Sequence, residues 1–170
     1  MPASQTTARA SSQRRALHLL RVLVDALTSS ARAVEQSTGV TNAQLFLLQA
    51  LEADGPLGIG ELAARARTQS STVSIVIGRL VRARLVRKSR GGEDGRRAIV
   101  TLTAAGRRLA ARAPVAPTTR VIEALDALDP REARGLVGGL EVLVRGLEPS
   151  ATAAPMLFEA RGARRKAAPR

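Results

Sequence analysis

The chain has 170 residues, of which 27 are lysine or arginine and 14 are aspartate or glutamate, so its formal net charge at pH 7 is +13. This basic excess predicts a polyanionic partner or an anionic surface. Cysteine is absent and His18 is the single histidine, which excludes disulfides, thiolate chemistry and cysteine-built or histidine-rich metal sites. Aromatic residues make up 1% of the chain, which argues against the base stacking that binds single-stranded nucleic acids.

The N-terminal part of the sequence predicts a tail followed by a long helix. Residues 1–12 are rich in serine, threonine and alanine, so we expect a flexible N-terminal tail. Over residues 13–37, apolar residues such as Leu20, Leu23 and Leu27 recur at spacings of three and four, which places them on one face of a helix.

A second helix follows a turn. Thr41 and Gln44 have the Thr-x-x-Gln form of a capping box, in which a hydroxyl and an amide each satisfy a free backbone donor. The apolar residues behind it predict a helix to about Ala53, and Asp54-Gly55-Pro56 stops it.

Two closely spaced helices are predicted next, a short one over 61–67 and a longer one over 71–84. In the longer helix the residues at inward-facing spacing are Val73, Val76, Ile77 and Leu80. The residues predicted to face outward are Ser71, Thr72, Ser74, Ile75, Gly78, Arg79 and Arg82. A second helix with small hydroxyls near its start is typical of a helix-turn-helix, which brings that helix close to base edges.

A basic hairpin is predicted directly behind this helix pair. Residues 87–103 read as two short strands joined by a glycine-rich tip that carries several arginines. Over residues 79–97 there are eight basic and two acidic residues, a local net charge of 8 − 2 = +6. Arg96 at the tip suits the narrow minor groove of duplex DNA, and Asp94 is expected to orient the hairpin through an ion pair. The alternatives are a solvated charged face, a compositional bias, or an ordinary surface hairpin with a local ion pair.

The C-terminal part predicts further helices and a basic tail. A helix from Thr103 meets Pro114 and Pro117, and the sequence leaves open whether it kinks or breaks there. Asp129-Pro130-Arg131-Glu132 is a strong helix start, and the apolar stripe behind it runs to Leu147. The stripe consists of Leu136, Leu140, Leu143 and Leu147, widened by Val137 and Val144.

Six segments in this order resemble the multiple-antibiotic-resistance regulator (MarR) family of winged-helix transcription factors, over about residues 13–147. The segments are Thr41-Asn-Ala-Gln-Leu, Glu61-Leu-Ala, Ser71-Thr-Val, Leu85-Val-Arg, Asp94-Gly-Arg-Arg and Leu102-Thr-Ala-Ala-Gly106. The fold class expected is mainly α with a small β-hairpin wing, as a winged helix-turn-helix flanked by N- and C-terminal dimerisation helices. The domains expected are a tail (1–12), an N-terminal dimerisation helix (13–37), the winged helix-turn-helix (38–113), C-terminal dimerisation helices (114–148) and a basic disordered tail (149–170).

The resemblance implies a sequence-specific regulator that binds double-stranded DNA as a homodimer on a pseudo-palindromic operator, most often as a repressor released by a small acidic or aromatic ligand. The DNA-binding residues expected are Ser70, Ser71, Thr72, Ser74, Ile75, Arg79, Arg82, Arg87, Lys88, Arg90, Asp94, Arg96 and Arg97. The candidates for a ligand pocket are Arg14, His18 and Arg21. Two positions depart from the family pattern: Ile75 replaces a residue that is often polar, and Arg84 stands where glycine is common, so the local path is expected to differ.

Two other functions remain open. A non-specific architectural protein would coat DNA using the hairpin and the basic tail as charge. An enzyme is the weaker rival, because the sequence offers no nucleophile with an adjacent base and no metal-ligand spacing, and we expect neither catalysis nor a cofactor or metal. No apolar run approaches the roughly 18 residues of a membrane span, and a secretion signal is absent, so we expect a cytoplasmic, nucleoid-associated protein without membrane contact.

Overall fold

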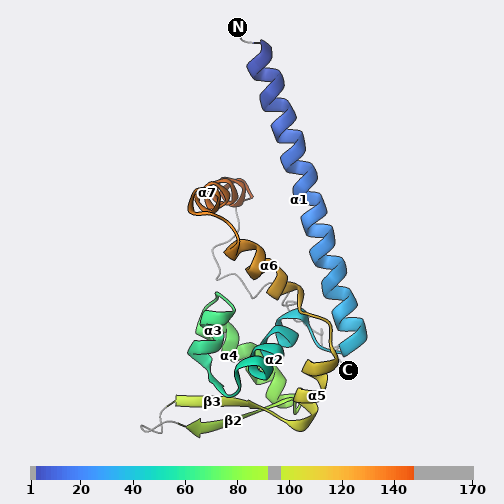
Figure 1. Ribbon diagram of the computed structural model, residues 1–170, viewed down its shortest axis with the longest axis vertical. Coiled ribbons are helices and arrows are strands. Elements are labelled where there is room, and N and C mark those ends of the chain that lie inside the picture. The colour runs from blue at the N-terminus through green and yellow to red at the C-terminus, as the bar shows by residue number, and fades with distance from the viewer. Residues whose placement is uncertain (1–2, 92–96, 148–170) are drawn as a thin grey trace, which may run out of the picture.

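The computed structural model describes residues 3–91 and 97–147, which form a mainly helical chain with one small antiparallel sheet (Figure 1). The predicted fold class is confirmed. The elements in chain order are α1 (Ala3–Thr38), α2 (Asn42–Asp54), β1 (Leu57–Gly58), α3 (Ile59–Arg65), α4 (Ser70–Arg82), β2 (Val86–Gly91), β3 (Arg97–Leu102), α5 (Ala104–Arg112), α6 (Pro117–Asp126) and α7 (Pro130–Gly146).

Helix α1 begins at Ala3, ten residues before the start that the apolar spacing predicts, so the predicted flexible tail over 1–12 is wrong for residues 3–12. This segment contains neither glycine nor proline, and nothing in it interrupts the helical backbone. The N-terminal part of α1 projects away from the other helices (Figure 1). Although α1 has 36 residues, no helix in the described part of the chain is apolar enough over sufficient length to cross a membrane.

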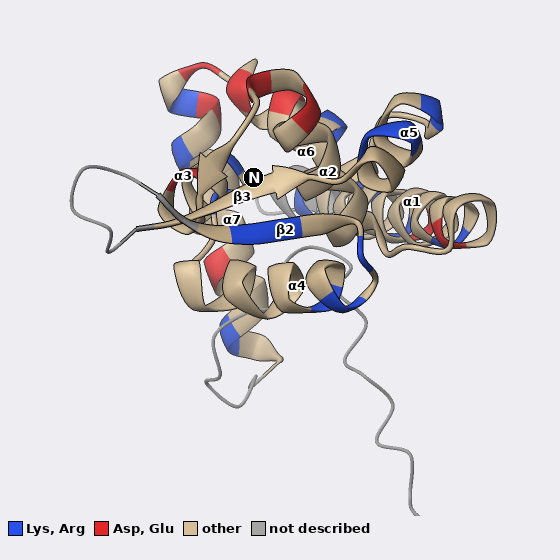
Figure 2. Cartoon of the chain, turned by 90° about the horizontal axis from the view of Figure 1, so that it is seen from below, with Lys and Arg blue, Asp and Glu red and all other residues tan. Residues whose placement is uncertain are grey.

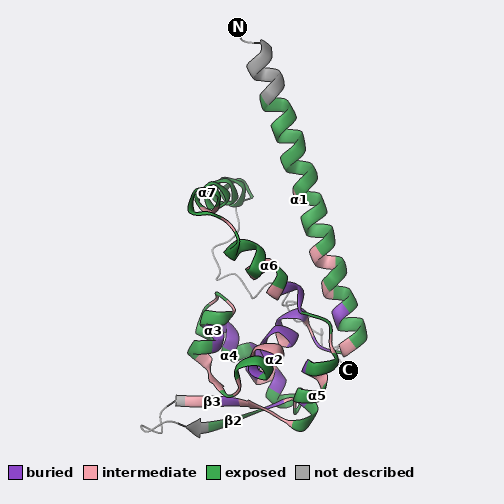
Figure 3. Ribbon diagram, in the orientation of Figure 1, coloured by how far each residue is buried: buried purple, intermediate pink, exposed green. Residues whose placement is uncertain are grey.

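Helix α2 is the centre of the core. The predicted capping box is confirmed: the backbone N–H of Gln44 donates to the Thr41 hydroxyl at 3.3 Å, and the backbone N–H of Thr41 donates to Gln44 Oε1 at 2.9 Å. The helix contacts α1, α3, α4, α5, α6 and β3, and burial concentrates around it (Figure 3). Its buried apolar residues are Ala43, Leu45, Phe46, Leu47, Leu48 and Leu51.

The sheet has the strand order β1-β3-β2, and both pairings are antiparallel. The hairpin of β2 and β3 is the predicted one, with Val86 opposite Leu102 and Lys88 opposite Val100. Strand β1 was not predicted, because two residues carry no alternating pattern and their pairing of Leu57 with Val100 is a tertiary contact. The tip of the hairpin lies outside the described residues.

The chain breaks its helix between α5 and α6, which answers the question that the two prolines left open. Helix α5 ends at Arg112, and Pro117 occupies the first turn of α6, where its missing N–H costs no hydrogen bond. Gln49 of α2 holds the connection from both sides: its amide nitrogen donates to the Pro114 carbonyl at 2.9 Å, and its Oε1 accepts from Ala116 N–H at 2.9 Å.

One buried side-chain pair fixes the start of α6 on α2. Asn42 Nδ2 donates to the Thr118 hydroxyl at 2.7 Å, and Thr118 N–H donates to Asn42 Oδ1 at 3.4 Å. Both residues are buried, and a buried polar side chain that loses its partner costs about 1–3 kcal/mol. The pair therefore selects one placement of α6 against the core.

Helix α7 begins as predicted, at a capping box in which the Asp129 carboxylate accepts from two backbone amides and Glu132 accepts from Asp129 N–H at 2.9 Å. No residue of this 17-residue helix is buried within the chain. A helix draws most of its stability from packing of its apolar face, so α7 leaves that face available for a partner.

The base of the hairpin is joined to α5 by a close backbone approach at Gly106. Thr103 Oγ1 accepts from Gly106 N–H at 3.1 Å and lies within hydrogen-bond distance of the Arg84 carbonyl, at 2.9 Å. A Cβ atom added at Gly106 would lie 2.0 Å from the backbone oxygen of Leu85. Only glycine fits at this position without a shift of the backbone.

We expect Gly106→Ala to lower the free energy of unfolding by about 1–3 kcal/mol, because the methyl group meets backbone rather than a flexible side chain. Gly60→Ala is the matched control, since nothing lies within 4 Å of its added Cβ and alanine favours the helix. Chemical denaturation of both variants measures the difference. Equal stability of the two would contradict the close approach.

Candidate nucleic-acid interface

Helices α3 and α4 form the helix pair that the sequence predicts. The four residues expected to face inward from α4, at positions 73, 76, 77 and 80, are all buried. Helix α3 starts with Glu61 Oε2 accepting from Gly58 N–H at 2.6 Å. The turn between the helices contains Arg67 with a φ of 48°, and a hydrogen bond from Thr68 N–H to the Ala63 carbonyl at 3.0 Å closes it.

The outward face of α4 carries small hydroxyls and one apolar side chain. Ser71, Ser74 and Ile75 are exposed, and Ile75 retains 56% of its surface. Thr72 was predicted to face outward and this is wrong: it is 8% exposed. Thr72 lies one helical turn before Val76, at the edge of the buried stripe, and its side chain therefore turns into the core.

Basic residues extend from α4 into the hairpin. Between Glu61 and Glu93 the sequence contains no acidic residue. The four basic side chains at positions 82, 84, 87 and 88 are exposed, while Arg79 is half-buried and engaged in a contact within the chain. Figure 2 shows this charge on β2 and at the end of α4 that leads into it. The face formed by α4 and β2 is thus positively charged and carries no carboxylate of its own elements.

Arg84 adopts the left-handed backbone conformation that is common for glycine at the end of a helix. Its φ is 57°, so the chain keeps the left-handed path here with arginine in place of glycine, and the expectation of a different path is wrong. Arg84 N–H donates to the Val81 carbonyl at 2.9 Å, and Leu85 N–H donates to the Leu80 carbonyl at 3.0 Å. These two bonds form a Schellman cap and offset part of the roughly 1–2 kcal/mol that a left-handed residue costs.

The hairpin brings two more predicted residues to one end of the sheet. Arg90 pairs with Ala98 and Gly91 with Arg97 at the far end of β2 and β3. Asp94 and Arg96, predicted to orient and insert the tip, lie outside the described residues, so both roles stay predictions. Ser70 is exposed at the first position of α4.

A cavity of about 620 Å³ lies between α1 and α6, a site that the sequence did not locate. Its wall is largely apolar, with Leu23, Leu27 and Val34 from α1 facing Val121 from α6. Among the described residues that line it, Arg120 alone is charged. The three candidates from the sequence are not brought together here: neither Arg14 nor His18 lines the cavity, and Arg21 lines a separate, smaller depression of about 350 Å³ on α1.

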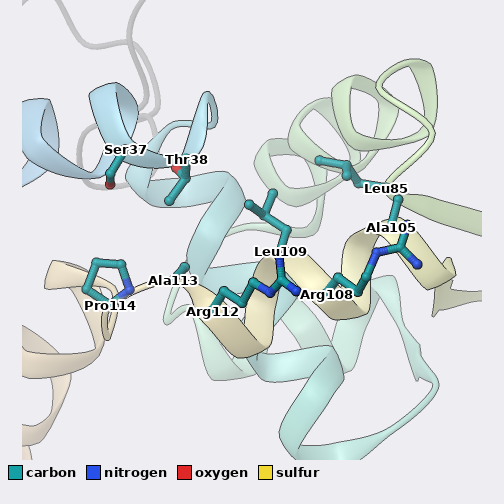
Figure 4. A pocket seen from close by; sticks show the side chains of 9 residues that line it. All are labelled: Ser37, Thr38, Leu85, Ala105, Arg108, Leu109, Arg112, Ala113 and Pro114. Atoms are coloured by element: carbon teal, nitrogen blue, oxygen red, sulfur yellow. The ribbon is translucent and has the colours of Figure 1, made fainter.

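A second cavity of about 430 Å³ lies where the end of α1 meets α5 (Figure 4). Arg108 and Arg112 line it from successive turns of α5, and Leu85 and Leu109 supply apolar wall. Spacing along α5 puts the two arginines on one face, but only the tertiary contact with α1 makes a cavity of that face. Within the described residues, no group of three or more His, Cys, Asp or Glu side chains is arranged to hold a metal ion.

Comparison with known proteins finds a family model that matches part of the chain. A family model described as the MarR family matches residues 38–97, which contain the helix pair and most of the hairpin. No curated protein sequence matches the chain.

Solved structures of similar fold include several regulators. A probable transcriptional regulator from Pseudomonas aeruginosa is 28% identical, with a TM-score of 0.51, and the match covers 72% of this chain and 93% of that one. BpsR of Bordetella bronchiseptica, whose DNA binding is regulated by 6-hydroxynicotinic acid, is 26% identical, with a TM-score of 0.50. That match covers 79% of this chain and 99% of BpsR. MepR of S. aureus, solved with DNA, is 22% identical with a TM-score of 0.52, covering 77% and 96%, and shows the fold alone.

The family model covers five of the six segments that carried the resemblance, and the surrounding helices follow the fold of the solved regulators. The predicted resemblance is therefore confirmed for residues 38–97, which match the model of the MarR family.

Proposed function

We propose that the protein is a transcriptional regulator that reads double-stranded DNA by sequence, as a homodimer on a pseudo-palindromic operator. The observation that carries this proposal is the outward face of α4, where Ser71, Ser74 and Ile75 are exposed beside a basic surface without carboxylates. Small side chains allow a helix to approach base edges, and an exposed isoleucine suits contact with a thymine methyl group. The match of residues 38–97 to the MarR family model and the similarity to a probable transcriptional regulator support the same function.

The hairpin supplies the contacts to the DNA backbone in this proposal. Arg87 and Lys88 are exposed on β2, and each cation that neutralises a phosphate releases a counterion and adds affinity without reading sequence. The tip residues Asp94 and Arg96 keep their predicted roles, with Arg96 entering the minor groove. Two α4 helices of a dimer would then meet successive major grooves about 34 Å apart.

The apolar faces of α7 and α1 support the homodimer. Helix α7 exposes a row of leucines and valines, and no residue of it is buried in the single chain. Helix α1 exposes further apolar residues along its projecting part, among them Leu17, Val22 and Leu23. Burial of both faces against a second copy would remove this surface from water, at about 25 cal/mol for each Å².

The cavity between α1 and α6 supports regulation by a small ligand, with release of DNA as the outcome in a repressor. Its apolar wall fits a ring or a short hydrocarbon, and the guanidinium of Arg120 fits a carboxylate. BpsR, one of the similar structures, has its DNA binding regulated by 6-hydroxynicotinic acid. The second candidate function, a non-specific architectural protein, rests on the basic charge alone and predicts equal affinity for all duplexes.

Binding to DNA is tested by footprinting on the duplex upstream of the gene, with Ile75→Ala and Arg87→Ala as the variants. Ile75→Ala should change the preference between operators, because it alters a base contact. Arg87→Ala should weaken binding to all sequences and lower the slope of log affinity against log salt by about one.

Arg9→Ala is the matched control for charge, since residue 9 belongs to the N-terminal part of α1. That part of the helix projects away from the hairpin (Figure 1). This variant should leave affinity and slope unchanged. Equal affinity of the parent protein for operator and random DNA would instead support the architectural function.

The dimer is tested by Leu140→Glu, which places a charge in the apolar row of α7 and should convert the dimer to monomers in sedimentation velocity. Val142→Glu is the matched control, because Val142 is equally apolar but lies on the opposite side of the same helix. The control should remain a dimer. A Leu140→Glu protein that sediments as the parent does would rule out this face as the interface.

The ligand site is tested with benzoate as a probe and benzamide as its uncharged control. Benzoate should raise the Tm of the parent protein, and Arg120→Gln should abolish that shift, because the carboxylate loses its guanidinium partner. Benzamide should give little shift with either protein. The same shift from both probes, or a full shift in Arg120→Gln, would argue against Arg120 as the anion-binding group.

A further inference from the structure

An ion pair joins the turn of the helix-turn-helix to the last residue of α6. The guanidinium of Arg67 donates to the carboxylate of Asp126, across 59 residues of sequence. Within the described residues, the main packing contacts of α6 are with α1 and α2, and neither helix of the pair is among them. The ion pair is therefore a polar contact between two parts of the chain that share little packing.

Each residue of the ion pair lies a few residues before the start of another helix, Arg67 before α4 and Asp126 before α7. Arg67 is the left-handed residue between α3 and α4, and only Thr68 and Gln69 separate it from the first residue of α4. Asp126 ends α6, and the chain continues from it within three residues to the cap of α7. A shift of one residue relative to the other changes the angle between α4 and the helices that we assign to the dimer.

Local stability does not explain arginine at position 67. The side chains of the pair are 50% and 55% exposed, and ion pairs of this exposure add little to folding. A φ of 48° favours glycine or asparagine over arginine. Arg67 thus combines an unfavourable backbone conformation with a side chain long enough to reach Asp126 on α6.

We infer that Arg67 and Asp126 are positioning residues that set the direction of α4 relative to α6 and α7, an inference that rests on the proposed function. The pair does not touch DNA in this scheme; it limits the range of separations between the two α4 helices of a dimer. Because it is exposed, loss of the pair should weaken operator binding by about two- to fivefold. The effect should shrink as salt screens the pair.

The orientation is measured directly by electron paramagnetic resonance, without DNA. The chain has no cysteine, so Ala83→Cys at the end of α4 and Glu123→Cys on α6 give two unique spin-label sites. Dilution with unlabelled protein keeps the measured distance within one chain. The parent should give a narrow distribution, and Asp126→Asn should broaden or shift it. The reversed pair, Arg67→Glu with Asp126→Arg, should restore it.

Two further variants separate positioning from folding. Asp54→Asn is the matched control, because it removes the ion pair of Asp54 with Arg65 at 2.7 Å, which joins α2 to α3, and it should leave the distribution unchanged. Arg67→Gly should keep or raise the Tm, since glycine adopts a positive φ without strain, and yet broaden the distribution. A distribution that Asp126→Asn leaves as in the parent, or a broadening that the reversed pair does not repair, would overturn the inference.

Operator affinity then connects the orientation to function. Label-free Asp126→Asn should lose two- to fivefold in affinity at low salt on the best half-site spacing and discriminate less between spacings, and this loss should shrink as the salt concentration rises. A slope reduced by about one in Arg67→Gly but not in Asp126→Asn would show that Arg67 contacts a phosphate instead. If the parent protein binds no duplex, the proposed function fails, whereas the distance measurement still decides whether the pair positions α4.

Discussion

The burial of α2 on nearly all sides is the constraint on which the other elements depend. Its apolar residues pack against α1, α4, α5 and β3, so the helix pair, the hairpin and the long N-terminal helix all take their places from it. Two polar side chains of α2 also restrict where α6 can lie. Asn42 forms a hydrogen bond with Thr118 at the start of α6, and Gln49 forms hydrogen bonds with the connection before it. Leaving a buried polar group without its hydrogen-bond partner costs about 1–3 kcal/mol of folding free energy. Few other arrangements of α6 therefore remain favourable.

Local signals were sufficient to predict most helices from the sequence. The boxes at Thr41 and Asp129 place helix starts within one residue, because capping involves groups only three positions apart. Long-range contacts were not predictable in this way. Strand β1 forms only because β3 lies beside it, and α1 begins at Ala3 because no residue stops it, although its first turns carry no apolar stripe.

The candidate interface was predictable from the sequence where it depends on spacing within one helix, and not where it depends on contacts between helices. Helical spacing correctly separated the core of α4 from Ser71, Ser74 and Ile75, and it failed at Thr72, where the edge of the buried stripe depends on what packs against it. For the ligand cavity, spacing in α1 identified an apolar face without revealing its partner. Arg120 meets that face from a helix far along the chain, 120 − 34 = 86 residues after Val34, whereas Arg14, His18 and Arg21 remain candidates only by their position in α1.

The connection between α5 and α6, with Pro114 and Pro117, is a place where the chain can change direction without bending a helix. Bending an intact helix breaks i→i−4 hydrogen bonds, but Pro114 has no N–H to lose, and Pro117 stands in a first turn where none is paired. Gln49 is the side chain that bridges both sides of this segment. A change of angle here would leave every helix intact, but it is opposed by the two hydrogen bonds of Gln49 and by the two between Asn42 and Thr118.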